Sequence, residues 1–204
     1  MKKIIVIIIS LFIGLQVIVA QDSRFGMSWD ITVPVGKTAD YTGDVSWLGF
    51  TMQWRKFMTD NVSLGLSLSW NVLDQRSFET QEFKFTPDGS DREISGALSG
   101  EQFRYLNSFP IVVEAHYYIG DPYDSKVRPF GGLGVGVTPI QKRTEIGIVA
   151  VTDTNWHFTL SPELGILIPL DQLDLMIAAN YNYAFKVKDT INYSFITFNV
   201  GLMF

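Results

Sequence analysis

Val62-Ser63-Leu64-Gly65-Leu66-Ser67-Leu68-Ser69-Trp70-Asn71-Val72 is the stretch that decides the fold. Every even position is large and apolar, and every odd position is Ser, Gly or Asn. A period of two predicts a β-strand with one apolar and one polar face, because a helix would scatter both kinds of side chain around its axis. About eleven residues is also the length with which a tilted strand crosses a bilayer. The apolar face therefore meets either a protein core or lipid.

Seven further stretches of the chain alternate in the same way. They cover residues 25–33, 45–57, 104–119, 127–138, 155–168, 173–183 and 192–204. The connections alternate between short and long, as they do in outer-membrane barrels, which have an even number of strands, short periplasmic turns and longer extracellular loops. We therefore predict an all-β fold, a closed antiparallel up-and-down transmembrane β-barrel of about eight strands. Residues 74–103 and 140–155 are expected to be its long loops, the first with a possible protruding hairpin near Phe83-Lys84-Phe85.

The polar faces of these stretches carry almost all of their charge, and the apolar faces carry almost none. A soluble antiparallel barrel has the opposite arrangement, with its charges outside and its apolar side chains inside. Trp and Tyr also stand near the ends of the predicted strands, where a membrane interface favours them. We therefore predict that the apolar faces contact lipid and that the charges line the interior: Arg55, Glu114, His116, Arg128, His157, Glu163 and Asp174.

The first twenty residues have the layout of a secretory signal peptide. Lys2 and Lys3 precede an apolar run from Ile4 to Val19, and Ala20 is a suitable last residue before cleavage. The alternative, an uncleaved membrane anchor, needs a longer apolar run. We predict a signal peptide over residues 1–20 and one barrel domain over residues 21–204, exported to the outer membrane.

Composition excludes several other classes of protein. The formal net charge is −5 and no basic patch is present, so nucleic acid is not an expected partner. The chain has no cysteine, which excludes disulfides and a lipid anchor on an N-terminal cysteine. No glycine-rich phosphate loop precedes a helix. The two histidines lack cysteine or closely spaced carboxylates, so we expect no metal and no cofactor.

The last strand carries a more specific pattern. Here the chain resembles bacterial outer-membrane barrel proteins, in which a final strand that ends in Phe after alternating apolar residues is read by the barrel-assembly machinery. The wider layout, including the glycine-rich residues 128–136, looks like the small OmpX/OmpA-type or porin-like barrel domains of Bacteroidetes. The resemblance implies outer-membrane lipid and the assembly machinery as partners. The residues that form the implied assembly signal are Ile196, Phe198, Val200, Leu202 and Phe204.

A charged network is predicted inside the barrel. Glu114 and Glu163 lie at similar mid-strand depth, separated by a strand that turns glycines inward, and Arg55 and Arg128 point inward nearer the periplasmic turns. A charge in such an interior must be paired or hydrogen-bonded. We expect these four residues to form a structural network, and the alternative is a path for protons or ions.

One set of residues could suggest an enzyme. His157, Ser161 and Glu163 share a face, and some small outer-membrane barrels that resemble this chain are lipid A deacylases with Ser, His and an acid. Ser161 is four residues from His157, roughly 13 Å along a strand, which is too far for a nucleophile and its base. We therefore expect no catalytic residues and no enzyme.

An eight-stranded barrel leaves an interior just wide enough to be filled by side chains. We expect a monomeric, non-enzymatic outer-membrane protein that meets an extracellular ligand through residues 74–103 and 140–155. The alternatives are a narrow channel or carrier for small or apolar solutes and, third, a lipid A-modifying hydrolase.

Overall fold

The computed structural model describes residues 23–85, 94–121, 126–146, 149–170, 173–188 and 190–204. The predicted signal peptide, residues 1–20, lies outside this part of the chain and stays a prediction. Within the described ranges, no helix is long and apolar enough to cross a membrane. The elements are β1 (Ser23–Val35), the 3-10 helix η1 (Gly36–Thr38), β2 (Gly49–Thr59), β3 (Val62–Phe85), β4 (Ile94–Ser108), β5 (Ile111–Tyr118), β6 (Arg128–Ile146), β7 (Val149–Leu170), β8 (Leu173–Ala184) and β9 (Tyr193–Met203).

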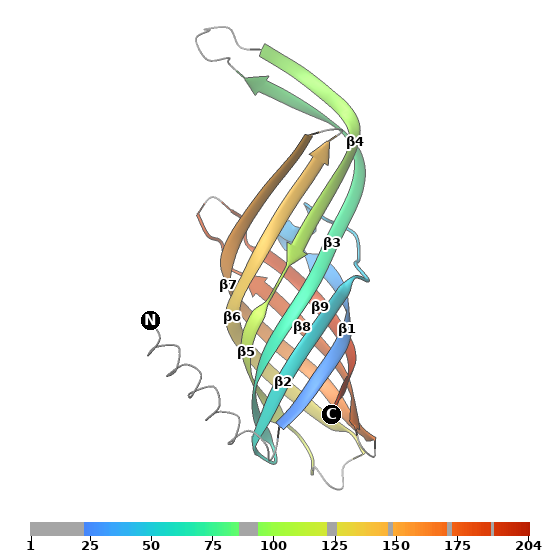
Figure 1. Ribbon diagram of the computed structural model, residues 1–204, viewed down its shortest axis with the longest axis vertical. Coiled ribbons are helices and arrows are strands. Elements are labelled where there is room, and N and C mark those ends of the chain that lie inside the picture. The colour runs from blue at the N-terminus through green and yellow to red at the C-terminus, as the bar shows by residue number, and fades with distance from the viewer. Residues whose placement is uncertain (1–22, 86–93, 122–125, 147–148, 171–172, 189) are drawn as a thin grey trace, which may run out of the picture.

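The strands form one antiparallel sheet that closes on itself (Figure 1). Its order is β2-β1-β9-β8-β7-β6-β4-β3-β5, and the further pairs β2–β3 and β5–β6 complete the ring. The first and last strands pair over ten residues, from Gly26 opposite Met203 to Val35 opposite Ser194. This seam confirms the predicted closed up-and-down barrel.

β4 and β5 occupy a single place in the ring. Both lie between β3 and β6 in the same register, and only Phe109 and Pro110 separate them. Proline has no N–H to give to the ladder, so the strand is interrupted there. The barrel wall therefore has eight positions, as the alternating stretches predicted.

The two faces of the wall lie as predicted. Leu64, Leu66 and Leu68 point outward and are exposed, whereas Ser63 and Ser67 point inward and are buried. The same division holds along β5, where Ile111 and the other outward residues alternate with buried ones at every position. Because the exposed face is apolar and the buried face polar, the barrel has the inside-out arrangement of a membrane protein.

The barrel is taller on one side, where two pairs of strands rise above the rest (Figure 1). β3 pairs with β4 as far as Phe85, and β6 pairs with β7 as far as Ile146. The prediction that residues 74–103 and 140–155 are loops is therefore wrong for most of their length, although the hairpin suspected near Phe83 is present. Residues 74–103 and 140–155 lack apolar alternation because neither of their faces meets lipid. They are nevertheless strands, because their backbones are hydrogen-bonded in the pairs β3–β4 and β6–β7.

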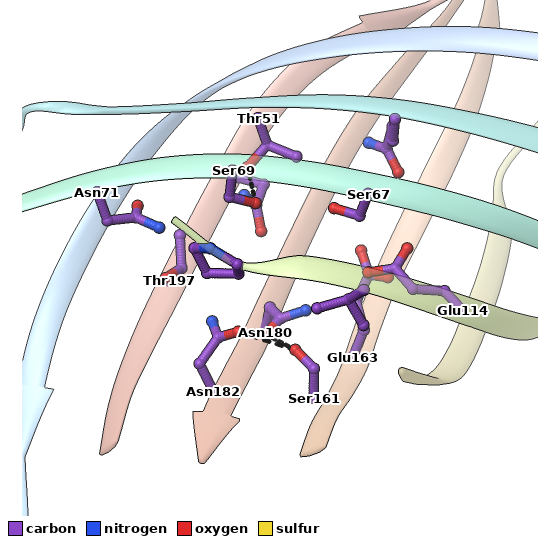
Figure 2. Close-up of a pocket in the computed structure, with 14 residues that line it drawn as sticks. Thr51, Ser67, Ser69, Asn71, Glu114, Ser161, Glu163, Asn180, Asn182 and Thr197 are labelled. Carbon is purple, nitrogen blue, oxygen red and sulfur yellow. Dashed lines mark hydrogen bonds between the residues drawn. The ribbon is translucent and has the colours of Figure 1, made fainter. Parts of the chain in front are cut away.

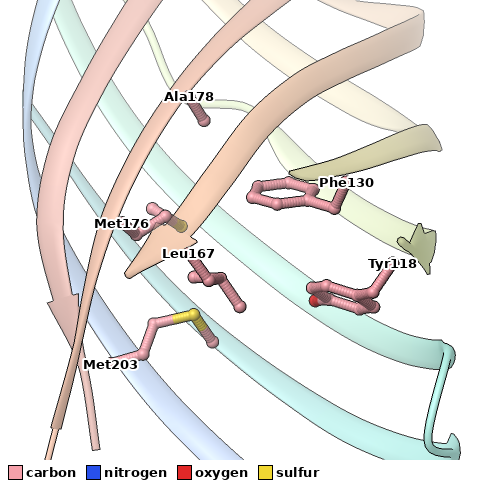
Figure 3. Packing of buried hydrophobic residues seen from close by; sticks show 6 residues of the cluster. All are labelled: Tyr118, Phe130, Leu167, Met176, Ala178 and Met203. Carbon is pink, nitrogen blue, oxygen red and sulfur yellow. The ribbon is translucent and has the colours of Figure 1, made fainter. Parts of the chain in front are cut away.

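Two apolar clusters fill the barrel near its ends. The lower cluster consists of side chains from five strands that meet in the interior (Figure 3). The upper cluster lies beneath the tall side of the wall, with Tyr41 and Ile191 packed against it. The members are Tyr118, Phe130, Leu167, Met176, Ala178 and Met203 in the lower cluster, and Leu73, Leu106, Ile140, Ala184 and Tyr193 in the upper one.

Candidate functional site: the buried charged cluster and the polar chamber

Between the two apolar clusters the interior is polar, and its charged centre comes from β2, β5 and β7. Arg55, Glu114 and Glu163 point inward because each stands at an inward position of the strand alternation. Gly65 lies between Arg55 and Glu114 in the sheet, paired with both. A Cβ at Gly65 would lie 2.5 Å from the Trp54 carbonyl oxygen and 3.2 Å from Arg55 Cγ, so the glycine allows the close approach of β2 and leaves room for the arginine side chain.

Glu163 is the centre of the charged cluster. Arg55 Nη2 donates to both of its carboxylate oxygens at 3.2 Å, and His116 Nε2 lies 2.7 Å from Oε2. Arg55 also donates from Nη1 to the Tyr118 hydroxyl at 2.9 Å and from Nε to Gln53 Oε1 at 2.9 Å. Every donor edge of this fully buried guanidinium therefore has a partner, as a charge in a low-dielectric interior requires.

Glu114 is less completely paired than Glu163. Its Oε2 lies 3.6 Å from His116 Nε2, which is beyond ordinary hydrogen-bond length. The residue is only 5% exposed, and its carboxylate lines the same cavity as that of Glu163. Two buried carboxylates thus flank one imidazole and share one arginine.

Two glycines of β6 make room for the charged cluster. Gly132 pairs with both His116 and Glu163, and a Cβ there would lie 2.4 Å from His116 Cδ2. Gly134 pairs with Glu114, and a Cβ there would lie 3.1 Å from Glu114 Cγ. Glycine weakens a strand unless something needs the space. The imidazole of His116 accounts for Gly132, whereas Val112, whose Cγ1 would lie 2.4 Å from a Cβ, and Glu114 together account for Gly134.

Above the cluster lies a small polar chamber (Figure 2). The cavity inside it has a volume of about 20 Å³, which is enough for one water molecule. Asn71 Nδ2 and Thr197 Oγ1, both on residues that line this cavity, are buried and have no hydrogen-bond partner. Polar atoms of this kind are usually satisfied by bound water or an ion.

A third buried carboxylate borders the chamber. Asp30 accepts hydrogen bonds from Ser28 Oγ at 2.9 Å, Thr51 Oγ1 at 2.5 Å and Asn199 Nδ2 at 2.6 Å. These are neutral donors, so Asp30 adds a carboxyl group to the interior without adding a cation. The middle of the barrel is consequently richer in carboxylates than in arginine or lysine, over the residues whose side chains the structure describes.

The upper mouth is covered by the connection from β1 to β2. The Tyr41 hydroxyl donates to the Arg143 carbonyl at 3.0 Å and shares a 2.7 Å hydrogen bond with Thr144 Oγ1. Lys142 Nζ lies 4.0 Å from the centre of the Tyr41 ring. Burial raises the pKa of Tyr41, against the effects of Thr144 and Arg104, so the phenol keeps its proton at neutral pH. Burial and Arg104 lower the pKa of Lys142, while Asp153 acts in the opposite direction.

The structure brings three of the four predicted network residues together and places the fourth apart. Arg128 Nη2 donates to the Asp60 carbonyl at 2.5 Å, and its guanidinium lies over the rings of Phe57 and Tyr118 at the lower end of the barrel. The network residues that sequence reasoning missed are His116 and Tyr118. Their signal was present, because both follow Glu114 at intervals of two on the same face of the strand.

The residues considered for a hydrolase do not meet. His157 Nδ1 lies 2.8 Å from the Phe185 carbonyl, and Ser161 Oγ lies 2.7 Å from Asn180 Oδ1 and 2.9 Å from Asn182 Oδ1. A different serine, Ser63, lies 3.5 Å from His116 Nδ1, on the opposite side of the imidazole from Glu163. Ser63 itself is fully buried, and its hydroxyl lies 3.2 Å from that of Tyr118.

The expectation that neither histidine has carboxylates nearby is wrong for His116. Ligand atoms of Glu114, His116 and Glu163 all lie within 4.8 Å of one another. The error has two causes. Glu163 comes from a strand that is distant in sequence. Glu114 and His116 are only two residues apart, and on a strand this spacing places both side chains close together on one face.

Comparison with protein families finds no match for this chain, and comparison with curated proteins also finds none. Solved structures do match. Neisserial surface protein A has 14% sequence identity and a TM-score of 0.50, with 89% of this chain and 94% of that chain covered. The outer-membrane protein OprG from Pseudomonas aeruginosa has 12% identity and a TM-score of 0.51, with coverage of 89% and 94%.

At these identities the likeness establishes the fold and leaves activity open. The chain has the fold of the small outer-membrane β-barrels, which confirms the resemblance seen in its sequence. The Bacteroidetes-like character of that resemblance stays a prediction.

Proposed function

We propose that this chain is an outer-membrane barrel with a sealed interior, which acts on the cell surface through its two tall hairpins. The observation that carries the proposal is the pair of apolar clusters that close the barrel above and below its polar chamber. An open pore needs a continuous polar path, whereas here Tyr118 and Phe130 fill the lower end and Leu73 and Leu106 the upper end.

The outer surface supports a place in the membrane. A belt of exposed apolar side chains surrounds the barrel at every strand, far larger than the patches that soluble monomers expose. Aromatic side chains border this belt on its upper side, where Trp29 stacks on Trp47 and Trp70 stacks on Phe109. Tyr117 stands at the lower border. Interfacial aromatics of this kind separate lipid from water in transmembrane barrels.

The tall hairpins supply the surface for a partner. β8 pairs with β7 only from Thr159 onward, so β7 above this point presents a free edge. β2 pairs with β3 only up to Asn71, which leaves a second free edge on the other side. Exposed apolar residues, Phe78 and Val151, stand on these segments beyond the lipid belt. Free strand edges with exposed side chains are surfaces onto which an extended ligand can add.

The assembly signal belongs to the same proposal. Phe198, Val200, Leu202 and Phe204 are exposed along β9, which forms one side of the seam with β1. We infer that the barrel-assembly machinery recognises this apolar row before the seam closes. The charged cluster then serves as a structural network, and no catalytic role is needed for it.

Conductance measurements test the sealed interior against the channel or carrier alternative. In planar lipid bilayers we expect the refolded protein to give no stable single-channel steps, because both apolar clusters block the lumen. The porin-sized steps of a known porin in the same bilayer serve as the control. Stable unitary steps that depend on protein concentration would contradict a sealed barrel and favour the narrow channel.

The orientation of the hairpins can be checked on intact cells. An epitope inserted between Phe85 and Ile94 should bind antibody without permeabilisation, since this hairpin lies at the end of the barrel opposite to the start of β1 and the end of β9. The matched control is the same epitope inserted at the short turn of Asp60 and Asn61, which should be detected only after the outer membrane is opened. The reverse pattern would mean that the barrel is inserted the other way round.

A further inference from the structure

The interior contains three ligand atoms that converge on one point. His116 Nε2 lies 2.7 Å from Glu163 Oε2 and 3.6 Å from Glu114 Oε2, and all the ligand atoms are within 4.8 Å of one another. Around a metal ion with bonds of about 2.0–2.2 Å, neighbouring ligands stand roughly 3–3.5 Å apart. Shifts of a few tenths of an ångström at the His116 contacts, together with closer approach of the two carboxylates, would bring these atoms to such spacing.

The donor set selects a class of metal. One imidazole nitrogen and two carboxylates suit zinc and the neighbouring divalent transition metals, whereas calcium and magnesium prefer all-oxygen sites. His116 can present its Nε2 lone pair if its proton is on Nδ1, where Ser63 Oγ at 3.5 Å accepts it. Arg55 stays on Glu163 and does not compete for the imidazole.

The charge of the cluster also favours a cation. Arg55 forms an ion pair with Glu163, whereas Glu114 has a hydrogen bond from Ser67, the more distant charge of Arg55, and His116 Nε2 at 3.6 Å. Asp30 adds a further carboxyl group with neutral donors. Buried charges in a low-dielectric interior are paired or coordinate metals. A divalent ion between Glu114 and Glu163 would stabilise both side chains as carboxylates.

A second observation, independent of the three ligands, points to a polar guest. The cavity lined by Glu114 and Glu163 also meets Asn71 and Thr197, whose side-chain Nδ2 and Oγ1 atoms are buried without partners (Figure 2). Both residues line this cavity, which has a volume of about 20 Å³. A water molecule in this cavity would supply a further ligand to an ion at the two carboxylates.

We propose that Glu114, His116 and Glu163 form a binding site for one divalent transition-metal ion of the zinc class, with water from the polar chamber as the remaining ligand. Gly132 belongs to the design of the site, because any larger residue would displace the imidazole. The ion would bind β5 to β7 across the barrel interior, in addition to their indirect connection through β6.

The test supplies metal during refolding, because the ligands are buried in the finished barrel. Protein without an affinity tag is refolded in detergent with Zn²⁺ or with a chelator, desalted, and assayed for bound metal by atomic emission and for thermal unfolding. We expect one equivalent of zinc and a higher unfolding temperature in the zinc sample. With Co²⁺ in place of Zn²⁺, a ligand-field absorption band should appear.

The two histidines provide matched variants. His116→Gln and Glu114→Gln should each lower affinity for zinc at least about 100-fold, more than an outer-shell change does. His157→Gln, at the other buried histidine, should retain the metal. Equal metal content in wild type and both site variants would overturn the proposal, as would loss of metal in His157→Gln. If His116→Gln does not fold, Glu114→Gln, which keeps the shape of the side chain, decides the result.

Discussion

Replacing Arg55 with alanine should destabilise the barrel by about 3–5 kcal/mol, the range found when one partner of a buried ion pair is removed. The reason is the carboxylate left behind. Arg55 gives Glu163 two hydrogen bonds inside a water-poor interior, and its loss also leaves the Tyr118 hydroxyl and Gln53 without their donor. Urea unfolding of refolded protein in detergent, with chelator present, measures the change.

Two controls separate this effect from loss of an arginine in general. Arg24→Ala breaks an ion pair with Asp174 in which the arginine is 43% exposed, and should cost less than about 1 kcal/mol. The double variant Arg55→Met with Glu163→Gln removes both charges and should recover much of the stability lost in Arg55→Ala. Equal stability of Arg55→Ala and Arg24→Ala would contradict a buried network.

Leu66→Arg should impair assembly, at a cost of about 2–4 kcal/mol if the position is near the membrane midplane. Leu66 points outward from β3, is 39% exposed, and is paired with Trp54 on one side and Val113 on the other, well below the upper aromatic border. Arginine there would place a charge in hydrocarbon. Heat-modifiable gel migration and outer-membrane fractionation report the assembled fraction.

The matched control for Leu66→Arg lies on the same strand and the same face. Asp74 lies eight residues further along β3, where its side chain is exposed beyond the lipid belt. Asp74→Arg should therefore change the stability by no more than about 0.5 kcal/mol. Wild-type assembly of Leu66→Arg would mean that the leucine face does not meet lipid, and the assignment of the two faces would then be reversed.

The barrel wall could be predicted because its signal is local. A side chain on a strand faces the side opposite to its neighbour, so the sequence alone shows that Leu64 and Trp70 share one face and Ser67 lies on the other. Which face meets lipid followed from the distribution of charge over all the strands. The tall hairpins could not be predicted in the same way. Around Asp74 and Arg76 the outward face meets water instead of lipid, so no apolar alternation is required there, and pairing with β4 holds the strand.

The charged cluster was only partly predictable for a related reason. Alternation showed that Arg55, Glu114 and Glu163 point inward, but which of them meet depends on the stagger of strands across the lumen. Arg55 reaches Glu163 from a strand 108 residues away in sequence, whereas Arg128, also inward, lies too low and binds the Asp60 carbonyl instead. The contact between Glu114 and His116 could have been predicted from the sequence, because the two residues are two positions apart on one strand and therefore share a face.

The seam between β1 and β9 has a consequence for the order of folding. Asp30 and Asn199, which are hydrogen-bonded across it, are 169 residues apart in the chain, and Phe25 and Phe204 exchange backbone hydrogen bonds at its lower end. Contacts this distant form slowly, since most of the chain must be ordered before they are made. We therefore expect seam closure to be the last and slowest kinetic phase, preceded by an open sheet whose two unpaired edges are exposed to aggregation.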